Sequence, residues 1–160
     1  MSDSSDFDIA PILGRISSGI FILTVKNGDQ ETGMLASWVM QAGFEPPMIS
    51  VSVKKGRYIA GWLDQGLPFV LNVVAEGQVN LLKHFSRGFE PQEPAFEGVD
   101  VARTPNGIPV LSEALGHLEC KPSGSIESGD HHVFLAEVTG GCLSREAKPM
   151  IHVRKNGMQY

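Results

Sequence analysis

The feature that most constrains the fold is a succession of short apolar segments, each bounded by turn residues. Residues 19–25 and 32–44 flank the pair Asn27-Gly28, which readily adopts the positive φ angles of a tight turn, so the two segments predict a β-hairpin. In residues 49–53, isoleucine and valine alternate with serine, which predicts a strand with one apolar and one hydroxylated face. A chain built from such segments has to bury them in an antiparallel sheet.

The rest of the chain supports a mainly β fold. Further strands are expected at residues 68–75, 114–127, 130–143 and 149–154, and helix-type spacing occurs in residues 9–16, 57–66 and 77–88. Residues 86–107 are rich in proline, glycine and acidic residues and predict a long surface excursion, which is typical of a lid. Because strands and helices do not alternate regularly, we expect an antiparallel β-barrel with short helices added to it.

Composition limits the classes of partner. A chain of 160 residues with 42% apolar and 19% charged residues predicts one folded domain, and a formal net charge of −5 argues against nucleic acid and anionic membranes as partners. Cys120 and Cys142 lack CxxC spacing, which favours core thiols in a reducing compartment. Without an apolar stretch of ~20 residues or a signal pattern, a cytoplasmic location is expected. The polar residues 1–8 predict a disordered leader before a domain at 9–160.

Two adjacent histidines, His131 and His132, suggest a metal site at first sight. Successive side chains of a strand point to opposite faces, however, so these two imidazoles diverge and cannot easily share one ion. The other histidines are scattered without ligand spacing, so no metal site is predicted. Two interpretations stay open: one histidine packs in the core, or one histidine at the mouth of the strand donates to a ligand.

A second constellation lies in residues 34–39 and 50–59, where small and hydroxyl residues precede Lys54, Lys55 and Arg57 at a strand-to-helix junction. Serine hydroxyls, backbone N–H groups and these cations are suited to hold a phosphate. The alternatives are a solvated basic surface and, for Trp38, a place in the core. The chain has no GxGxxG and no Walker loop, which disfavours dehydrogenases of the Rossmann type and P-loop nucleotidases.

The order of "MLASWVMQAGFEPPMISVSVKKGRYI", "FVLNV", "LLKHF", "HLECK" and "GDHHVFLAEV" resembles the flavin reductase-like group of FMN-binding split barrels, from about Leu13 to Tyr160. More narrowly, "GRISSGIFILTVKNGD", "MLASWV", "LKHF" and "RKNGMQY" resemble the C-terminal flavin reductase module of cyanobacterial-type diiron flavoproteins. In that case the chain is one module of a larger protein.

The resemblance implies a six-stranded antiparallel Greek-key split β-barrel, commonly a homodimer, with FMN in a groove near the dimer interface. Gly129, Asp130 and His131 match the family's Gly-Asp-His motif, which makes His131 the candidate catalytic contact for the nicotinamide carboxamide or the flavin, and His132 a structural residue. The candidate FMN-binding residues are Leu35, Ala36, Ser37 and Trp38 along the isoalloxazine ring, Ser52, Lys54, Lys55 and Arg57 at the phosphate with Val53 in the same strand, and Asn72, His84, Phe85 and Arg87 along the rest of the flavin.

The implied activity is hydride transfer from NADH or NADPH to bound FMN, with onward electron transfer to diiron and flavodoxin-like domains of a parent chain. Two positions depart from the family pattern: Ala136 replaces a frequent glycine, and Trp38 replaces a small residue, so either side chain could restrict access of a second ring. The alternatives are a non-enzymatic FMN-binding electron-transfer module, a split-barrel oxidase of pyridoxine phosphate, and a structural subunit without cofactor. The pyridoxine phosphate oxidase needs a second cluster of basic residues, which is absent outside residues 145–155.

Overall fold

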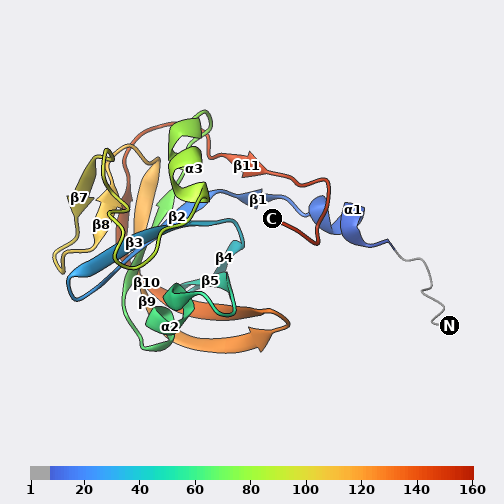
Figure 1. The fold of residues 1–160 in the computed structure, drawn as a ribbon, viewed down its shortest axis with the longest axis horizontal. Coiled ribbons are helices and arrows are strands. Elements are labelled where there is room, and N and C mark those ends of the chain that lie inside the picture. The colour runs from blue at the N-terminus through green and yellow to red at the C-terminus, as the bar shows by residue number, and fades with distance from the viewer. Residues whose placement is uncertain (1–7) are drawn as a thin grey trace.

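The computed structural model describes residues 8–160, so almost all of the predicted leader (residues 1–7) lies outside the described residues. The described chain is mainly antiparallel β structure with short helices on its surface and at one end (Figure 1). Its elements are α1 Ala10–Gly14, β1 Ser18–Gly19, β2 Phe21–Asn27, β3 Gln30–Ala36, β4 Val39–Phe44, β5 Pro47–Lys54, α2 Tyr58–Asp64, β6 Phe69–Val73, α3 Val79–Ser86, β7 Val101–Arg103, β8 Pro109–Leu111, β9 Gly116–Ser128, β10 His131–Leu143 and β11 Ile151–His152.

The main sheet has seven strands in the order β3-β2-β6-β9-β10-β5-β4, and every neighbouring pair is antiparallel. The two edge strands, β3 and β4, are joined by Ser37 and Trp38 alone. Because two residues cannot cross the width of a flat sheet, the sheet has to curl until its edges meet at this corner. The mainly β, barrel-like class predicted from the sequence is confirmed, and the strand count exceeds six because the segment predicted as one strand at 32–44 bends into two.

The barrel interior is filled by the apolar residues of the strands, which alternate with polar residues as predicted for residues 49–53. Val51 and Val53 of β5 are buried, whereas the intervening Ser52 is only partly covered on the other face. Helix α2 lies between β5 and β6, and it places Trp62 and Leu63 in the same core cluster as these valines. Helix α2 therefore covers the barrel where the chain crosses from β5 to β6. The turn before it, residues 55–57, lies at the edge of the barrel.

A second apolar layer lies outside the barrel, beneath α3. Ile22 points to this layer while its neighbour Leu23 points into the barrel, as the alternation of a strand requires. Phe85 of α3 packs onto β3 at Gly33, where an added Cβ would lie 2.6 Å from the Phe85 ring. Helix α3 is thus fixed against the sheet, and the chain that follows it is carried over the corner at residues 37–38.

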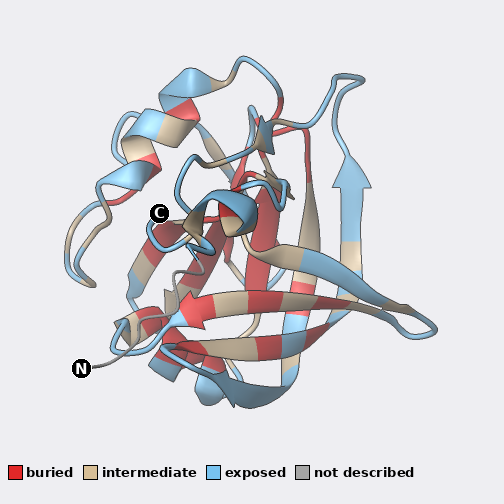
Figure 2. Cartoon of the chain, turned by 90° about the vertical axis from the view of Figure 1, so that its right-hand side faces the viewer, coloured by how far each residue is buried: buried red, intermediate tan, exposed pale blue. Residues whose placement is uncertain are grey.

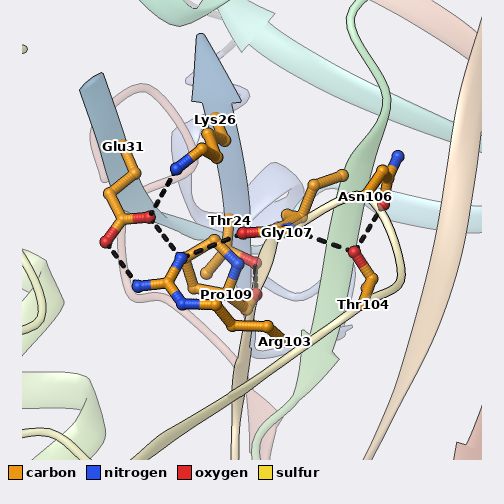
Figure 3. A network of polar contacts seen from close by, with 9 residues as sticks. Thr24, Lys26, Glu31, Arg103, Thr104, Asn106, Gly107 and Pro109 are labelled. Atoms are coloured by element: carbon orange, nitrogen blue, oxygen red, sulfur yellow. Dashed lines mark hydrogen bonds and ion pairs between the residues drawn. The ribbon is translucent and has the colours of Figure 1, made fainter. Parts of the chain in front are cut away.

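The predicted excursion at 86–107 contains β7, which pairs with β8 as a small hairpin. Its strongest tie to the barrel is Arg103, which donates to both carboxylate oxygens of Glu31 on β3 at 2.6 and 3.0 Å and to the Gly107 carbonyl at 2.9 Å (Figure 3). Lys26 lies 3.9 Å from the same carboxylate. The Arg103 hydrogen bonds hold the pKa of Glu31 below its usual value, so the carboxylate is ionised when the hairpin is docked.

Strands β9 and β10 form a long hairpin in which residues 123–128 of β9 are exposed, whereas β10 begins at the buried His131. Along the strands of the barrel, buried residues alternate with less buried ones (red and tan in Figure 2). The strands predicted at 114–127 and 130–143 are confirmed nearly to the residue. The strand predicted at 149–154 shrinks to β11, two residues that pair with β1, and the chain then runs without regular structure beside α1. Within the described residues, the helices are too short to cross a bilayer.

Candidate functional site

A groove of about 1230 Å³ opens on the outside of the barrel at the corner between β3 and β4. Four parts of the chain enclose it: the corner itself, the β5–α2 turn, the chain after α3, and the segment that follows β11. Its lining includes most of the predicted cofactor-binding residues, namely Leu35, Ala36, Ser37, Trp38, Ser52, Val53, Lys54, Arg57, Phe85 and Arg87. Most of the cofactor-binding residues predicted from the sequence therefore lie along this one groove.

Trp38 forms one wall of the groove. It lies in the two-residue corner between β3 and β4 and belongs to neither strand. Its carbonyl accepts the Ser52 amide at 3.0 Å, which fixes the corner to β5 and leaves the half-buried indole over the outer face of the sheet. The partly covered Ser52 lies on that same face and also lines the groove, so a hydroxyl group is available beside the indole. A flat apolar surface beside polar groups is suited to an aromatic ligand that carries polar substituents.

The rim beside this wall is cationic. Strand β5 ends at Lys54, and the turn passes through Gly56, whose φ of +88° suits glycine, to Arg57 before α2 begins. Lys54 and Arg57 line the groove and, among the described residues, form no ion pair. Two exposed cations without a protein partner favour an anionic group of the ligand at this rim.

Lys55, the third predicted cation, points away. Its ammonium group lies 3.4 Å from the Glu127 carboxylate on β9, and it does not line the groove. The side chains of adjacent residues at the end of a strand point in opposite directions. Lys54 therefore lines the groove, whereas Lys55 points to the β9–β10 hairpin.

His131, the predicted catalytic contact, lies beside the groove but is not among the residues that line it. It pairs with Lys54 across β10 and β5, and its ring centroid lies 4.7 Å from that of Trp38. Its Nδ1 lies 2.7 Å from the Asp130 carboxylate, which only accepts, so Nδ1 carries a proton, and Nε2 forms a hydrogen bond with the Tyr160 hydroxyl. Hydrogen bonding from His131 lowers the pKa of Asp130. The histidine is 7% exposed and held in one orientation against the indole.

His132 faces the other side of β10. Its ring lies 6.0 Å from Phe134, which belongs to the barrel core. The predicted divergence of the two histidines is therefore confirmed, and at most one of them faces the groove. Within residues 8–160, no three His, Cys, Asp or Glu side chains cluster as metal ligands do.

The chain after α3 forms the opposite wall. Arg87 pairs with Glu93 at 2.7 Å and lies over the Phe89 ring at 4.5 Å. The Tyr58 hydroxyl donates to the Phe89 carbonyl at 2.5 Å and lies 3.0 Å from the Thr32 hydroxyl. Desolvation raises the pKa of Tyr58, so the phenol stays protonated and keeps this donor. The first part of the predicted lid is thereby tied to α2 above the groove.

Besides Lys55 and His131, two further predicted residues, Asn72 and His84, do not line the groove. Asn72 is fully buried, where its amide nitrogen donates to the Ile22 carbonyl and its oxygen accepts the Leu111 amide, both at 2.9 Å. His84 donates from Nε2 to the Ala95 carbonyl at 2.7 Å and anchors the lid segment. Their polar atoms are engaged in joining strands and loops, so the structure does not place them against a ligand.

The structure adds residues that the sequence-based prediction missed. Tyr58, His152, Arg154 and Tyr160 line the groove, and the last two belong to a segment without regular structure. In the sequence, "RKNGMQY" is recognisable only as part of the family resemblance. A segment without regular structure has no periodicity, so its position in the fold could not be predicted. Ala136, one of the departures from the family pattern, lies in the barrel core and does not line the groove.

Comparison with known protein families gives one match, the flavin reductase like domain, over residues 13–159. Among curated proteins, the chain is 40% identical over 159 residues to diflavin flavoprotein A 1 of Synechocystis sp., with 98% of this chain and 28% of that protein covered. It is 41% identical over 155 residues to putative diflavin flavoprotein A 3 of Nostoc sp., with 96% and 27% covered. The chain therefore spans little more than a quarter of the length of these relatives.

Several solved structures have a fold similar to that of this chain. The NADH:FAD oxidoreductase SgcE6 of Streptomyces globisporus C-1027 superposes with a TM-score of 0.82 at 27% identity, covering 89% of this chain and 85% of that one. The same protein in complex with NAD and FAD fragments superposes with a TM-score of 0.80 at 26% identity, with the same coverage of both chains.

Proposed function

The chain belongs to the flavin reductase-like family, and we propose that it is an NAD(P)H:FMN oxidoreductase module. The observation that carries this proposal is the pairing of the Trp38 wall with the free cations Lys54 and Arg57 in one groove. An isoalloxazine ring matches the aromatic wall, and a ribityl phosphate matches the cationic rim. Among family members of known structure, one is an NADH:FAD oxidoreductase at 27% identity, which supports a flavin ligand.

When bound, FMN accepts a hydride from the nicotinamide ring of NADH or NADPH. In the proposed site, Lys54 and Arg57 would hold the phosphate, and Ser52, which lines the same groove, would offer its hydroxyl to the bound flavin. The Trp38 indole excludes water from one side of the groove. His131 orients the donor by presenting Nε2, because its Nδ1 is held by Asp130. No protein nucleophile is required, so the residues act through binding and alignment.

The proposal is tested by titrating the purified chain with FMN and, separately, with riboflavin, following the visible flavin spectrum and the heat of binding. We expect FMN to bind and riboflavin to bind at least about tenfold more weakly, since the charged hydrogen bonds to the phosphate are lost. Equal affinities for the two flavins would show that the cationic rim does not recognise the phosphate.

A second candidate is a non-enzymatic FMN-binding electron-transfer module. The observation that favours it is the covering of Trp38, whose indole lies against His131 on one side and 5.4 Å from the Tyr160 ring. Stopped-flow reduction of wild type and Trp38→Ala separates the two functions. A large gain in the rate of reduction without the indole supports the electron-transfer module, whereas a loss of FMN affinity without a gain in rate supports the reductase.

We further propose two protein partners. One is a second copy of the chain: Met40 and Leu135 flank Ser50 on the outer face of the sheet, and Ile126 lies on the same face one strand further. These three side chains are exposed, and the face continues to Ser52 at the edge of the groove. The other partner is a parent polypeptide with diiron and flavodoxin-like domains, because the relatives are about four times longer and are diflavin flavoproteins.

A further inference from the structure

The segment at residues 153–160 lies against His131, the residue proposed to orient the hydride donor. The Tyr160 hydroxyl forms a hydrogen bond with His131 Nε2, and the Tyr160 ring lies 5.4 Å from the Trp38 ring. The Arg154 guanidinium lies 5.3 Å from the Trp38 ring centroid. Both nitrogens of the His131 ring are therefore engaged within the chain, Nδ1 by Asp130 and Nε2 by Tyr160.

This segment is held to the rest of the chain mainly through α1. It follows the two-residue strand β11, and its backbone bonds run from Arg154 to the Gly14 carbonyl at 2.9 Å and from Gly157 to the Ala10 carbonyl at 2.7 Å. The Arg15 side chain donates to the Arg154 carbonyl at 3.1 Å, and Gly157 packs closely on Leu13 and Gly14. Arg154 also donates to the Gln159 carbonyl at 2.6 Å, which ties the two ends of the segment together. The Tyr160 side chain is 67% exposed. A segment with so little burial can open locally while the barrel stays folded.

The segment does not use the groups proposed for the phosphate. Among the described residues, no side-chain hydrogen bond or ion pair joins Lys54 or Arg57 to Arg154 or Tyr160. Its contacts are with the indole of Trp38 and the imidazole of His131. The segment therefore covers the indole and the imidazole and leaves Lys54 and Arg57 without a hydrogen bond or ion pair to it.

We propose that segment 153–160 is a built-in competitor of the nicotinamide dinucleotide, with Tyr160 as the residue that sets its strength. This inference rests on the proposed function. Tyr160 occupies His131 Nε2 and has to leave before the donor's carboxamide engages that nitrogen. The apparent dissociation constant of the dinucleotide is then raised by the fraction of molecules in which the segment is closed. Arg154 acts through Tyr160 and Trp38, as a residue that positions the segment.

The first test needs no ligand. Acrylamide quenching of tryptophan fluorescence reports mainly on Trp38, because Trp62 is buried in the barrel core. Tyr160→Ala and Arg154→Gln should each make the fluorescence easier to quench than in wild type. Met158→Ala is the matched control, since Met158 lies in the same segment, is exposed and does not line the groove. Identical quenching of all four proteins would overturn the proposal that the segment covers Trp38.

The second test measures binding of NAD⁺ to the FMN-loaded chain by calorimetry, because NAD⁺ cannot transfer a hydride. Tyr160→Phe keeps the ring and removes the hydroxyl, so it should bind NAD⁺ about fivefold more tightly, the effect of losing one competing hydrogen bond. The FMN and NAD⁺ dissociation constants of the control Met158→Ala should match wild type, because Met158 does not line the groove.

Weaker or unchanged NAD⁺ binding by Tyr160→Phe would overturn the proposal that Tyr160 competes with the dinucleotide. Weaker binding would mean that the hydroxyl assists NAD⁺ binding, and unchanged binding would mean that it has no effect on it. A complete lack of NAD⁺ binding in all variants would overturn it as well. Failure of the proposed function is recognised separately, since it appears as a lack of FMN binding or of FMN reduction in wild type, while the quenching experiment still decides whether Tyr160 covers the indole.

Discussion

Lys54 and Lys55 are neighbours in the sequence with different surroundings in the structure. Lys54 lines the groove, whereas Lys55 is paired with Glu127. The sequence predicted a basic corner after an alternating strand, and that prediction places the cations correctly as a group. It could not separate the two lysines, because the register between β5 and β10 decides which one faces the hairpin.

Removing either free cation should weaken FMN binding. Lys54→Met and Arg57→Gln each delete a charged donor to the proposed phosphate, and we expect the FMN dissociation constant to rise about tenfold or more in each. Lys55→Met is the matched control and should bind FMN as wild type does. Calorimetric titration of the three variants checks this, and an equal loss for Lys55→Met would contradict the assignment of the rim.

The two cysteines should differ in reactivity. Cys120 is 1% exposed, and desolvation raises its pKa to about 12, so its thiolate is scarce at neutral pH. Cys142 is exposed on β10. We expect an aromatic disulfide reagent at pH 8 to label one thiol per folded chain and both after unfolding in guanidinium. Mass spectrometry that finds Cys120 labelled in the folded protein would refute the buried placement.

At the scale of elements, the sequence predicted most strands but not their interruptions. Residues 32–44 have one continuous apolar pattern, yet the chain turns a corner at Ser37 and Trp38, since closing the barrel requires the edges to meet there. The segment at 149–154 has strand-type alternation, but only two residues find a partner, in β1. Local pattern reports which residues are able to form a strand, and the availability of a neighbouring edge decides which of them do.

The β7–β8 hairpin should depend on the ion pair between Arg103 and Glu31. Because the folded pKa of Glu31 is below its ordinary value of 4.5, the pair stabilises the fold above that pH, and its contribution is lost as pH falls through the folded pKa. Glu31→Gln should lower the free energy of unfolding by about 0.5–1 kcal/mol at pH 7.

Urea unfolding at pH 7 and pH 3 measures this difference. The destabilisation by Glu31→Gln should shrink at pH 3, where the wild-type carboxylate is also losing its charge. Glu97→Gln serves as the control, because Glu97 forms no ion pair within the described residues. A destabilisation by Glu31→Gln that is as large at pH 3 as at pH 7 would mean that the contact is not electrostatic.

At the scale of the whole molecule, the exposed apolar face of β4, β10 and β9 predicts self-association. A charge at its centre, in Leu135→Lys, should convert a dimer into a monomer in sedimentation velocity runs, since an unpaired charge opposes burial of the face. Val79→Lys is the control, because Val79 is similarly exposed on α3, away from this face. A wild-type chain that sediments as a monomer would refute the proposed dimer.

The overall class could be predicted from strand patterning, and two parts of the groove, residues 34–39 and 50–59, from residues close together in the chain. The family resemblance, and no local pattern, pointed to Phe85 and Arg87. The remaining wall could not be predicted, since it is assembled from the chain after α3 and from Arg154 and Tyr160 in segment 153–160. These parts meet only when the barrel closes and carry no period of their own. Residues that join distant loops are thus the ones that sequence reasoning misses here.

Anaerobic mixing of the FMN-loaded chain with NADH, and in parallel with NADPH, tests the central claim most directly. Loss of the visible flavin absorbance with at least one dinucleotide, dependent on Lys54 and Arg57 through FMN binding, is the predicted result. Tightly bound FMN whose absorbance does not change with either dinucleotide would contradict the reductase function.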